Sequence, residues 1–347
     1  MSKSRGLFDE QFRLEKLSTK QDPLERLKGH IDFEYFRKPL ETGLRSSTDS
    51  SKGGRPAYDV ILMFKILILQ RYYNVSDDGI EYAILDRLSF MRFLGLGIHD
   101  AVPDAKTIWL FRDTLTRLKL VEKLFKYLDA QLDKDGIIVH KGKLIDASIV
   151  EVPISRNGRQ DNEDLKSGSI PAAWQKPENK HKLRQKDTDA KWTRKNNQNF
   201  FGYKNHIKAD VKTKLITGYK VTSANVADGT VVEGLLDKKE DGRQRLYGDC
   251  AYRSKTLDQI YRQKKIVNQI NEQGYNNKKI TAAQEKQNTR KSRIRVRIEH
   301  IFGFMANSMN RKFLKYRSFS RNEIGIGLMN LTYNLFRLIQ LNVELKK

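Results

Sequence analysis

Several features that often define a protein class are scarce in this sequence. Its 347 residues contain one cysteine, Cys250, which excludes an internal disulfide and a cysteine-rich zinc site. The longest apolar run, residues 60–69, is interrupted by Lys65 and is too short to cross a bilayer as a helix. The first residues, MSKSR, lack the apolar core of a secretory signal. These absences predict a cytoplasmic protein with no membrane partner.

Acidic residues are also few relative to basic ones. The chain has 66 Lys and Arg against 42 Asp and Glu, which gives a net charge of +24. Such an excess opposes compaction by self-repulsion, so a polyanionic partner is its natural explanation. With 38% hydrophobic residues, the chain can still bury a core, and its length suits two or three domains.

The first part of the chain divides into a polar segment and a helical module. Residues 1–53 are charged and irregular, with short helical patches such as residues 23–28, and lead into a linker rich in Ser and Gly at 46–54. Residues 54–135 carry short helical patterns, and Ser76 is placed to cap one of them. The expected helices cover residues 56–73, 77–85, 88–96, 103–118 and 120–132. Short helices with tight turns are typical of helix-turn-helix DNA-binding domains, and a plain helical bundle is the alternative.

The pattern changes at Gly136, and residues 136–347 form the expected second domain. Residues 155–198 are polar and predict an excursion that orders only on binding. Strands are expected at 137–140, 144–152, 203–211, 215–222, 245–248 and 266–270. Helices are expected at 228–236 and 254–264, where Asp228 and Ser254 can act as caps, and from a capping box at Ser320 to the C-terminus. In this last helix an apolar stripe favours core packing, with a dimer seam as the alternative; it comprises Ile324, Leu328, Leu331, Leu335 and Leu338. Strands followed by alternating strands and helices predict an α/β fold with a mixed sheet flanked by helices.

Two aspartates occupy unusual settings in these strands. Asp146 interrupts the apolar strand pattern of residues 144–150. An unpaired carboxylate buried there would cost several kcal/mol, so Asp146 needs a cation, a partner or a strand end. Asp249 follows the short strand at 245–248, at the carboxyl end where ligands of open α/β sheets bind. Each could instead be an ordinary turn or cap aspartate.

A third acid, Glu299, lies beside an apolar stripe on a very basic helix. Ile298, Ile301, Phe302 and Met305 recur at helical spacing. Five Lys or Arg residues occur between positions 290 and 297. An acid held beside such a surface suggests a metal bound next to DNA. The alternative is an ion pair between Glu299 and Arg295, one turn earlier.

Together the three acids predict a specific chemistry. Two strand acids and one helix acid could converge on one or two Mg²⁺ ions, because Mg²⁺ takes one or two carboxylates and leaves places for phosphate oxygens. Paired metals roughly 3.5–4 Å apart activate the attacking oxygen and stabilise the leaving oxygen of an in-line phosphoryl transfer.

Eight blocks in a fixed order carry a family resemblance. They are GRPAYD (54–59), LSFMRFLGL (88–96), VPDAKTIW (102–109), IDASIVEVP (145–153), DTDAKWT (187–193), FGYKNH (201–206), GDCAYRS (248–254) and RIEHIFG (297–303). This set resembles the DDE transposases of bacterial insertion sequences, and within the insertion-sequence-four-like superfamily it is most similar to the insertion-sequence-five group.

The resemblance implies a ribonuclease H-like catalytic domain in which Asp146, Asp249 and Glu299 are the catalytic and metal-binding triad. It implies Mg²⁺, with Mn²⁺ able to substitute, and cleavage and strand transfer at the terminal inverted repeats of the element. The expected partners are those repeats and target DNA. A homodimer assembled on two ends, in the bacterial nucleoid, is expected from the family.

One departure from the superfamily stands out. Its Tyr-Arg-Glu-Lys signature would place Tyr at 292 and Lys at 306, where this chain has Ser292 and Ala306. A non-catalytic DNA-binding protein of transposase ancestry is therefore the alternative function.

Further residues are candidates for DNA contact or for assistance near the metals. The DNA-contact candidates are Arg295, Arg297, Arg253, Tyr252 and Lys204. His206 and His300 could assist near the metals, although packing is the favoured interpretation for both. Asp187 and Asp189 lie in the polar excursion and are not counted as ligands.

Overall fold

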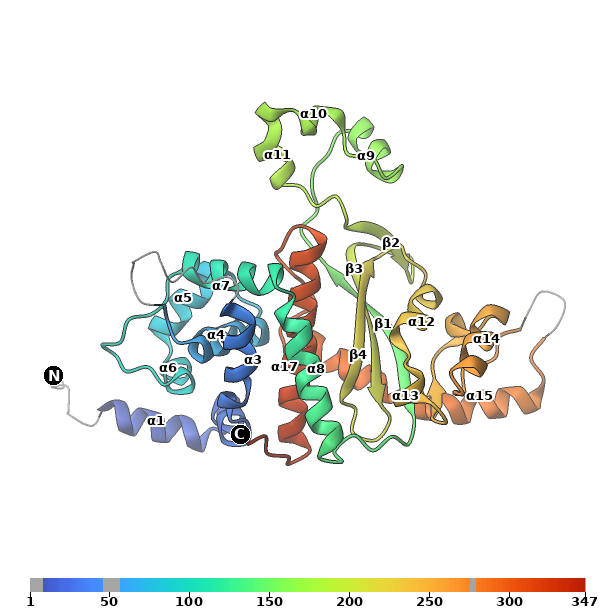
Figure 1. Ribbon diagram of the computed structural model, residues 1–347, viewed down its shortest axis with the longest axis horizontal. Coiled ribbons are helices and arrows are strands. Elements are labelled where there is room, and N and C mark those ends of the chain that lie inside the picture. Colours follow the sequence, from blue (N-terminus) through green and yellow to red (C-terminus); the bar gives the residue numbers. More distant parts are fainter. Residues whose placement is uncertain (1–8, 46–56, 275–278, 347) are drawn as a thin grey trace. The chain divides into compact units, whose positions relative to one another are not determined.

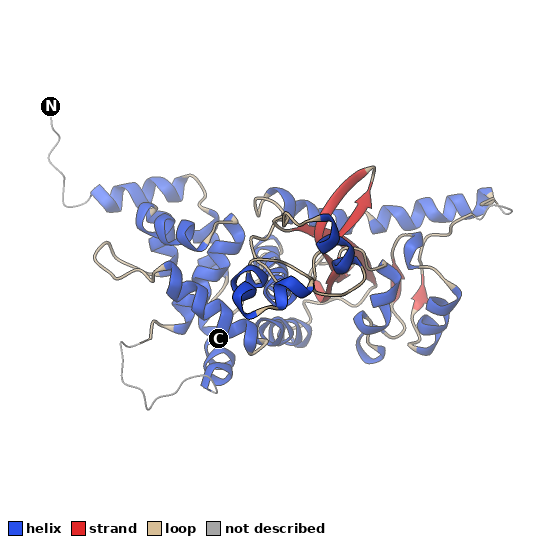
Figure 2. Ribbon diagram, turned by 90° about the horizontal axis from the view of Figure 1, so that it is seen from above, coloured by secondary structure: helices blue, strands red, loops and turns tan. Residues whose placement is uncertain are grey.

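The computed structural model describes residues 9–45, 57–274 and 279–346, and the expected linker at 46–54 lies outside these ranges. The chain forms two compact units. Unit 1 comprises Met1–Lys126 and Leu331–Lys347, and unit 2 comprises Tyr127–Asn330. Strands occur only in unit 2 among the described residues, and Figure 2 distinguishes them from the helices. The C-terminal helix, expected within the catalytic domain, contributes its residues from Leu331 onward to unit 1.

Unit 1 is helical in its described part. It contains α1 (Asp9–Thr19), α2 (Pro23–His30), η1 (Phe33–Phe36), α3 (Arg37–Leu44), α4 (Val60–Tyr73), α5 (Asp77–Asp86), α6 (Leu88–Leu94), α7 (Ala105–Arg117) and the start of α8 (Leu120–Lys134). Asp59, Ser76 and Asp104 each accept a backbone N–H of the helix that follows. The helix expected from residue 56 begins instead at Val60, because Asp59 caps it.

The expectation of an irregular segment before residue 45 is wrong for α1 and α3, whereas α2 confirms the helical patch expected at residues 23–28. Leu27 and Leu40 are fully buried, and the Phe33 ring lies 6.3 Å from that of Phe64 and 5.5 Å from that of Phe93. The charged residues conceal apolar residues spaced at three and four, and burial of these side chains orders the segment.

Unit 2 is built on a six-stranded mixed sheet (Figure 1). Its strands are β1 (Lys143–Glu151), β2 (Lys191–Lys195), β3 (Gln198–Asp210), β4 (Ile216–Ser223), β5 (Arg245–Tyr247) and β6 (Val267–Asn268). β3 pairs antiparallel with β1, β2 and β4, whereas β5 pairs parallel with β1 and β6 pairs parallel with β5. The path β4-β3-β1-β5-β6, three antiparallel strands followed by two parallel ones, is the ribonuclease H-like arrangement expected from the resemblance.

Helices cover both faces of this sheet. The remaining helical elements of unit 2 are α9 (Arg159–Lys166), α10 (Ala172–Gln175), η3 (Pro177–Asn179), α11 (Lys180–Arg184), η4 (Asp228–Val231), α12 (Val232–Leu235), α13 (Lys238–Asp241), η5 (Cys250–Tyr252), α14 (Lys255–Gln263), α15 (Ala282–Arg295), α16 (Arg297–Asn307) and the start of α17 (Phe319–Gln340). Ile145 of β1 packs with residues of α12 and α14. Asn205 of β3 lies on the opposite face, because Ile145 pairs with Lys208, and it bonds Asn330 of α17 at 2.7 Å.

Several expected elements differ from the structure. Residues 137–140 form no strand, since Gly136 and His140 have φ of 68° and 53°, which a strand does not accommodate. The polar excursion 155–198 contains short helices and β2, and Trp174 within it is buried. The basic stretch before residue 293 is the helix α15, capped by Thr281.

The C-terminal helix follows its expected pattern with one exception. Ile324, Leu328, Leu331, Leu335 and Leu338 are buried, which confirms the predicted core stripe. The helix begins at Phe319, so the Ser320 predicted as its cap lies in the first turn instead.

Candidate active site

Asp146 lies in the middle of β1, on the same face as its cross-strand partner Ile207. Its side chain is 17% exposed, and its Oδ1 accepts the N–H of Ala147 at 2.8 Å. Burial raises the pKa of Asp146 to about 6, and the negative charge of Asp249 adds to the shift, whereas the Ala147 N–H and Arg295 oppose it. This carboxylate therefore lies in a setting where a cation would be favourable.

The register of two parallel strands places Asp249 beside Asp146. Leu144 of β1 pairs with Tyr247 of β5, and each aspartate follows its paired residue by two positions. Asp249 lies at the carboxyl end of β5, as predicted, and is half-buried. Its Oδ1 accepts the N–H of Ala251 at 2.9 Å and caps η5. The charge effect of Asp249 on Asp146 agrees with this register.

Glu299 is connected to Asp146 through one guanidinium group. Arg295 Nη1 lies 3.7 Å from Asp146 Oδ2, and Arg295 Nη2 lies 3.6 Å from Glu299 Oε1. Glu299 is in the first turn of α16, and its side chain is 57% exposed. Ile298, Ile301 and Met305 are buried below it, as the apolar stripe predicted, whereas Phe302 is only half-buried. Glu299 therefore forms the ion pair with Arg295 that was the alternative interpretation, and the same guanidinium also lies beside Asp146.

Tyr252 lies in the hydrophobic core together with Ile145, Leu235 and Leu257. It is fully buried, and its hydroxyl has no hydrogen-bond partner in the described part of the chain. Burial raises its pKa, and Asp146, Asp228 and Asp249 add to the shift. Tyr252 therefore has no surface with which to contact DNA, because its side chain is enclosed by the protein.

The residues fit a divalent ion by donor type. Carboxylate oxygens are the ligands that Mg²⁺ prefers, and Asp146 and Asp249 supply them from adjacent strands. Within the described ranges, no group of three or more acidic, histidine or cysteine side chains is already arranged to hold a metal. Arg295 instead supplies the positive charge between Asp146 and Glu299.

Three of the DNA-contact candidates are held by contacts within the protein. Arg297 donates to the Val211 carbonyl at 3.0 Å. Lys204 Nζ donates to the Val226 carbonyl and to Asp228, each at 2.8 Å, so its ammonium is held within the protein. Arg253 is one-third exposed and pairs with Glu272 at 3.5 Å.

The two histidines lie in opposite environments. His206 is fully buried and bonds Thr222 Oγ1 at 2.8 Å, and burial lowers its pKa to about 4. His300 is exposed on α16. His206 therefore packs within the sheet, as the favoured interpretation held, whereas that interpretation is wrong for the exposed His300.

Two residues near this region were missed from the sequence. Asp228, read only as a helix cap, holds Lys204 at 2.8 Å and lies 3.9 Å from His206. Glu272 lies between Arg253 and Lys291, which are 38 residues apart (291 − 253). No local pattern signals either arrangement, since each joins segments that are distant in the chain.

Two protein families match this chain. The family described as "Transposase domain (DUF772)" matches residues 12–114, and the family described as "Transposase DDE domain" matches residues 139–335. The second match covers more than half of the 347 residues and includes Asp146, Asp249 and Glu299.

The backbone also resembles that of one solved structure, piggyBac transposase in a synaptic complex with hairpin DNA. The TM-score is 0.40 and the identity 12%, over 94% of this chain and 77% of the other. Among the described residues, no helix is long and apolar enough to cross a membrane. The match to the DDE domain establishes that the chain belongs to the DDE transposase family, whose members are phosphoryl-transfer enzymes of DNA transposition that depend on a divalent metal.

Proposed function

We propose that this chain is the transposase of a bacterial insertion sequence of the insertion-sequence-five group, which cleaves and rejoins DNA at the terminal inverted repeats of its element. Asp146, Asp249 and Glu299 are its metal-binding carboxylates, and Mg²⁺ is the proposed metal, with Mn²⁺ able to substitute. The observation that carries the proposal is the register of β1 and β5, which sets Asp146 beside Asp249, together with the Arg295 bridge from Asp146 to Glu299.

The bound metal would activate the attacking oxygen and stabilise the leaving oxygen of an in-line phosphoryl transfer. The side chains of this chain prepare that step. Asp146 is held by the Ala147 N–H and Asp249 by the Ala251 N–H, so both carboxylates are oriented before metal binds. Arg295 balances the negative charge of Asp146 and Glu299 and is a suitable donor to a phosphate once these acids bind the metal.

The two expected domains receive complementary roles. The helical region 54–135 recognises the element ends as a helix-turn-helix-like DNA-binding domain, and residues 136–347, with the insertion 155–198, perform the chemistry. A homodimer on two ends would bring both repeats together, in the nucleoid of the bacterial cytoplasm. The net charge of +24 supports contact with DNA at both stages.

The direct test is cleavage of DNA that carries the flanks of the gene, with Mg²⁺, with Mn²⁺ and with EDTA. Asp146→Asn, Asp249→Asn and Glu299→Gln should each lower metal-dependent cleavage by roughly a thousandfold or more, because each removes a metal-binding charge. DNA binding in EDTA should be unchanged. Glu285→Gln is the matched control, since Glu285 is exposed on α15 and makes the same change of charge.

The outcomes separate two functions. Cleavage retained by one of the three variants would remove that residue from the proposed set. DNA binding without strand breaks under every metal condition would instead favour a non-catalytic DNA-binding protein. This function is the second candidate because Ser292 and Ala306 depart from the superfamily signature.

A further inference from the structure

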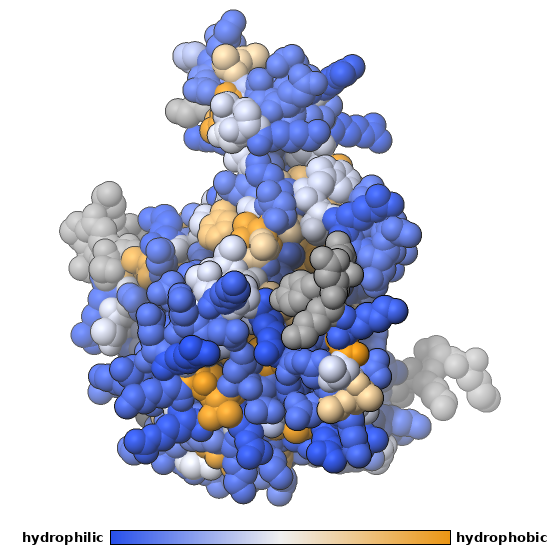
Figure 3. Space-filling view, turned by 90° about the vertical axis from the view of Figure 1, so that its right-hand side faces the viewer, coloured by the Kyte–Doolittle hydropathy of each residue, from blue (hydrophilic) through white to orange (hydrophobic). Residues whose placement is uncertain are grey.

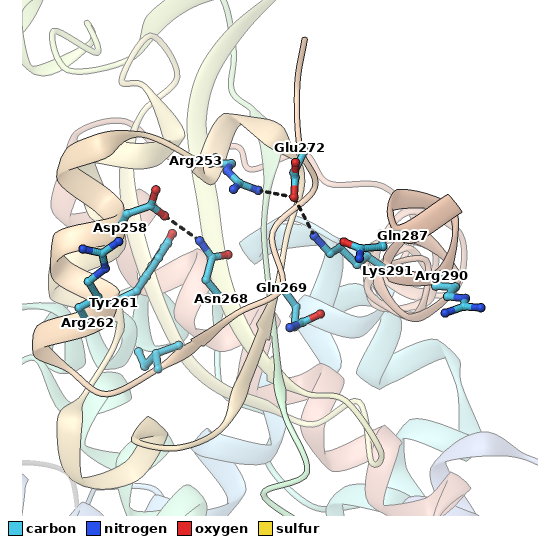
Figure 4. Close-up of a pocket in the computed structure, with 11 residues that line it drawn as sticks. Arg253, Asp258, Tyr261, Arg262, Asn268, Gln269, Glu272, Gln287, Arg290 and Lys291 are labelled. Atoms are coloured by element: carbon cyan, nitrogen blue, oxygen red, sulfur yellow. Dashed lines mark hydrogen bonds and ion pairs between the residues drawn. The ribbon is translucent and has the colours of Figure 1, made fainter. Parts of the chain in front are cut away.

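Unit 2 contains a polar cavity apart from the three candidate acids. Its volume is about 590 Å³. It lies between α14, the segment around β6, and α15 (Figure 4). Four lining residues are basic (Arg253, Arg262, Arg290 and Lys291), whereas two are acidic (Asp258 and Glu272). The lining therefore has an excess of two positive charges and is suited to an anion.

The two acids of the cavity are engaged differently. Asp258 Oδ1 accepts a hydrogen bond from Asn268 at 2.7 Å, which links α14 to β6 at the cavity lining. Glu272 projects between Arg253 and Lys291 in Figure 4. Its Oε1 lies 3.5 Å from Arg253 Nη1 and 3.9 Å from Lys291 Nζ. One carboxylate oxygen thus stands where two cations converge.

The contacts of that oxygen are long for charged groups. Direct hydrogen bonds between an ammonium or guanidinium and a carboxylate are about 2.7–2.9 Å. Arg253 and Lys291 instead donate to the carbonyl of Ile270, at 3.4 and 3.1 Å. Burial lowers the pKa of Lys291, which Glu272 only partly offsets. An anion with more oxygens than a carboxylate would satisfy both cations better.

The cavity also has unused donors. The guanidinium groups of Arg262 and Arg290 make no hydrogen bond or ion pair within the described ranges, and Figure 4 shows both side chains at the lining. Figure 3, viewed from the side where α14 and α15 lie in Figure 1, shows mainly hydrophilic residues with small separate hydrophobic groups. This surface therefore favours a charged ligand over an apolar one.

The sequence positions connect the cavity to the candidate acids. Arg253 follows Asp249 by four residues, beyond η5. Lys291 precedes Arg295 by four residues on α15, which is one helical turn. A strand bound at the acids would need to travel only a short distance to bring a neighbouring phosphate to Arg253 and Lys291.

We propose that this cavity binds a backbone phosphate of the DNA strand next to the candidate active site, and that Glu272 occupies the phosphate position until DNA displaces it. The choice of DNA as the source of the phosphate rests on the proposed function. Arg253 and Lys291 are the phosphate-binding pair, and Glu272 is an internal competitor that holds them in place in the free protein.

The first experiment compares Glu272→Gln with Glu285→Gln in equilibrium binding to a labelled duplex carrying the flank of the gene, in EDTA. Both substitutions remove one negative charge, and Glu285 lies exposed on α15 outside the cavity lining. Removal of the competitor should tighten binding by Glu272→Gln about three- to fivefold beyond the control. Equal changes in the two variants would overturn the proposal, because net charge alone would then explain them.

The second experiment measures how affinity depends on salt. Lys291→Ala should reduce the magnitude of the slope of log binding constant against log salt concentration by about 0.9, because one phosphate contact fewer releases one counterion fewer. Lys286→Ala, at an exposed position of the same helix, is the control and should leave the slope unchanged. Equal slopes for Lys291→Ala and the wild type would contradict a phosphate contact in the cavity. Unfolding midpoints of all variants exclude loss of fold as the cause.

Two further measurements separate the possible results. Inorganic phosphate is added alone to Glu272→Gln, and thermal stabilisation by phosphate with no gain in DNA affinity would show that the cavity takes free anions, which overturns the assignment to DNA. Metal-dependent cleavage is assayed separately. Absent cleavage would refute the proposed enzyme, while tighter DNA binding by Glu272→Gln would still support the cavity.

Discussion

At the residue scale, Arg295 is the cation that links the carboxylates of Asp146 and Glu299. Its guanidinium lies within 3.7 Å of both Asp146 and Glu299, and its buried Nε has no hydrogen-bond partner among the residues that the structure describes. The two ion pairs are long, and Glu299 is more than half exposed, so solvent weakens them. Arg295 thus stabilises the carboxylates in the free protein without binding them tightly.

We expect Arg295→Gln to bind Mn²⁺ about fivefold more tightly than the wild type, because a metal would no longer displace a guanidinium. Calorimetric titration without DNA measures this directly. Arg293→Gln, exposed on the same helix, makes the same change of charge and should leave metal affinity unchanged. Equal affinity of Arg295→Gln and the wild type would show that Arg295 does not compete with metal.

Asp187 joins three elements of unit 2. It is buried, and its Oδ1 accepts from the Tyr203 hydroxyl of β3 at 2.7 Å. Its Oδ2 accepts from the Ser318 N–H and from Asn322 of α17, each at 3.2 Å. The end of the insertion is thereby tied to the sheet and to the start of the C-terminal helix. Asp187, which is not counted as a metal ligand from its sequence context, therefore has a structural role, because it connects these elements.

We expect Asp187→Ala to lower the free energy of unfolding by about 2–4 kcal/mol, because several buried donors would lose their acceptor. Urea denaturation followed by circular dichroism measures the change. Asp189→Ala is the nearby control, since Asp189 is exposed and accepts one N–H, from Phe319. A loss as large for Asp189→Ala as for Asp187→Ala would contradict the distinct role of Asp187.

Charges inside unit 2 affect the stability of the whole molecule. Lys208 is 2% exposed, and its Nζ donates to Asp241 at 2.8 Å. Asp129 of α8 lies near this pair, and burial raises its pKa to about 7, with Glu240 and Asp133 adding to the shift and Lys143 and Lys208 opposing it. A carboxyl whose folded pKa exceeds its unfolded pKa favours folding while protonated.

The sign of the pH dependence follows from this shift. The contribution of Asp129 is fully present below its ordinary pKa of 3.8 and is lost as the pH rises through about 7. Asp129→Asn should therefore raise the unfolding midpoint by about 4 °C at pH 8 and leave it nearly unchanged at pH 4.

Thermal unfolding monitored across this pH range tests the prediction. Asp135→Asn, exposed at the end of the same helix, is the control. A gain for Asp129→Asn that does not depend on pH would contradict titration of Asp129 as the cause.

Much of the fold follows from local sequence patterns. Ser76 and Ser254 cap the helices that they were predicted to cap, and the five-residue apolar stripe of α17 is buried. Capping and periodicity act within one or two turns, so they can be read from neighbouring residues. The helices α1 and α3 were missed because charged residues outnumber the apolar ones in both.

The sequence by itself determined the net charge, most of the helices and strands, and the three candidate metal-binding acids. Only the tertiary structure decided what lies beside those acids. The β1–β5 register sets Asp146 beside Asp249, and the packing of α15 brings Arg295 to Asp146. Glu272 likewise meets Lys291 only through packing. These contacts join segments far apart in the chain, and they depend on strand register and helix packing, which no local pattern specifies.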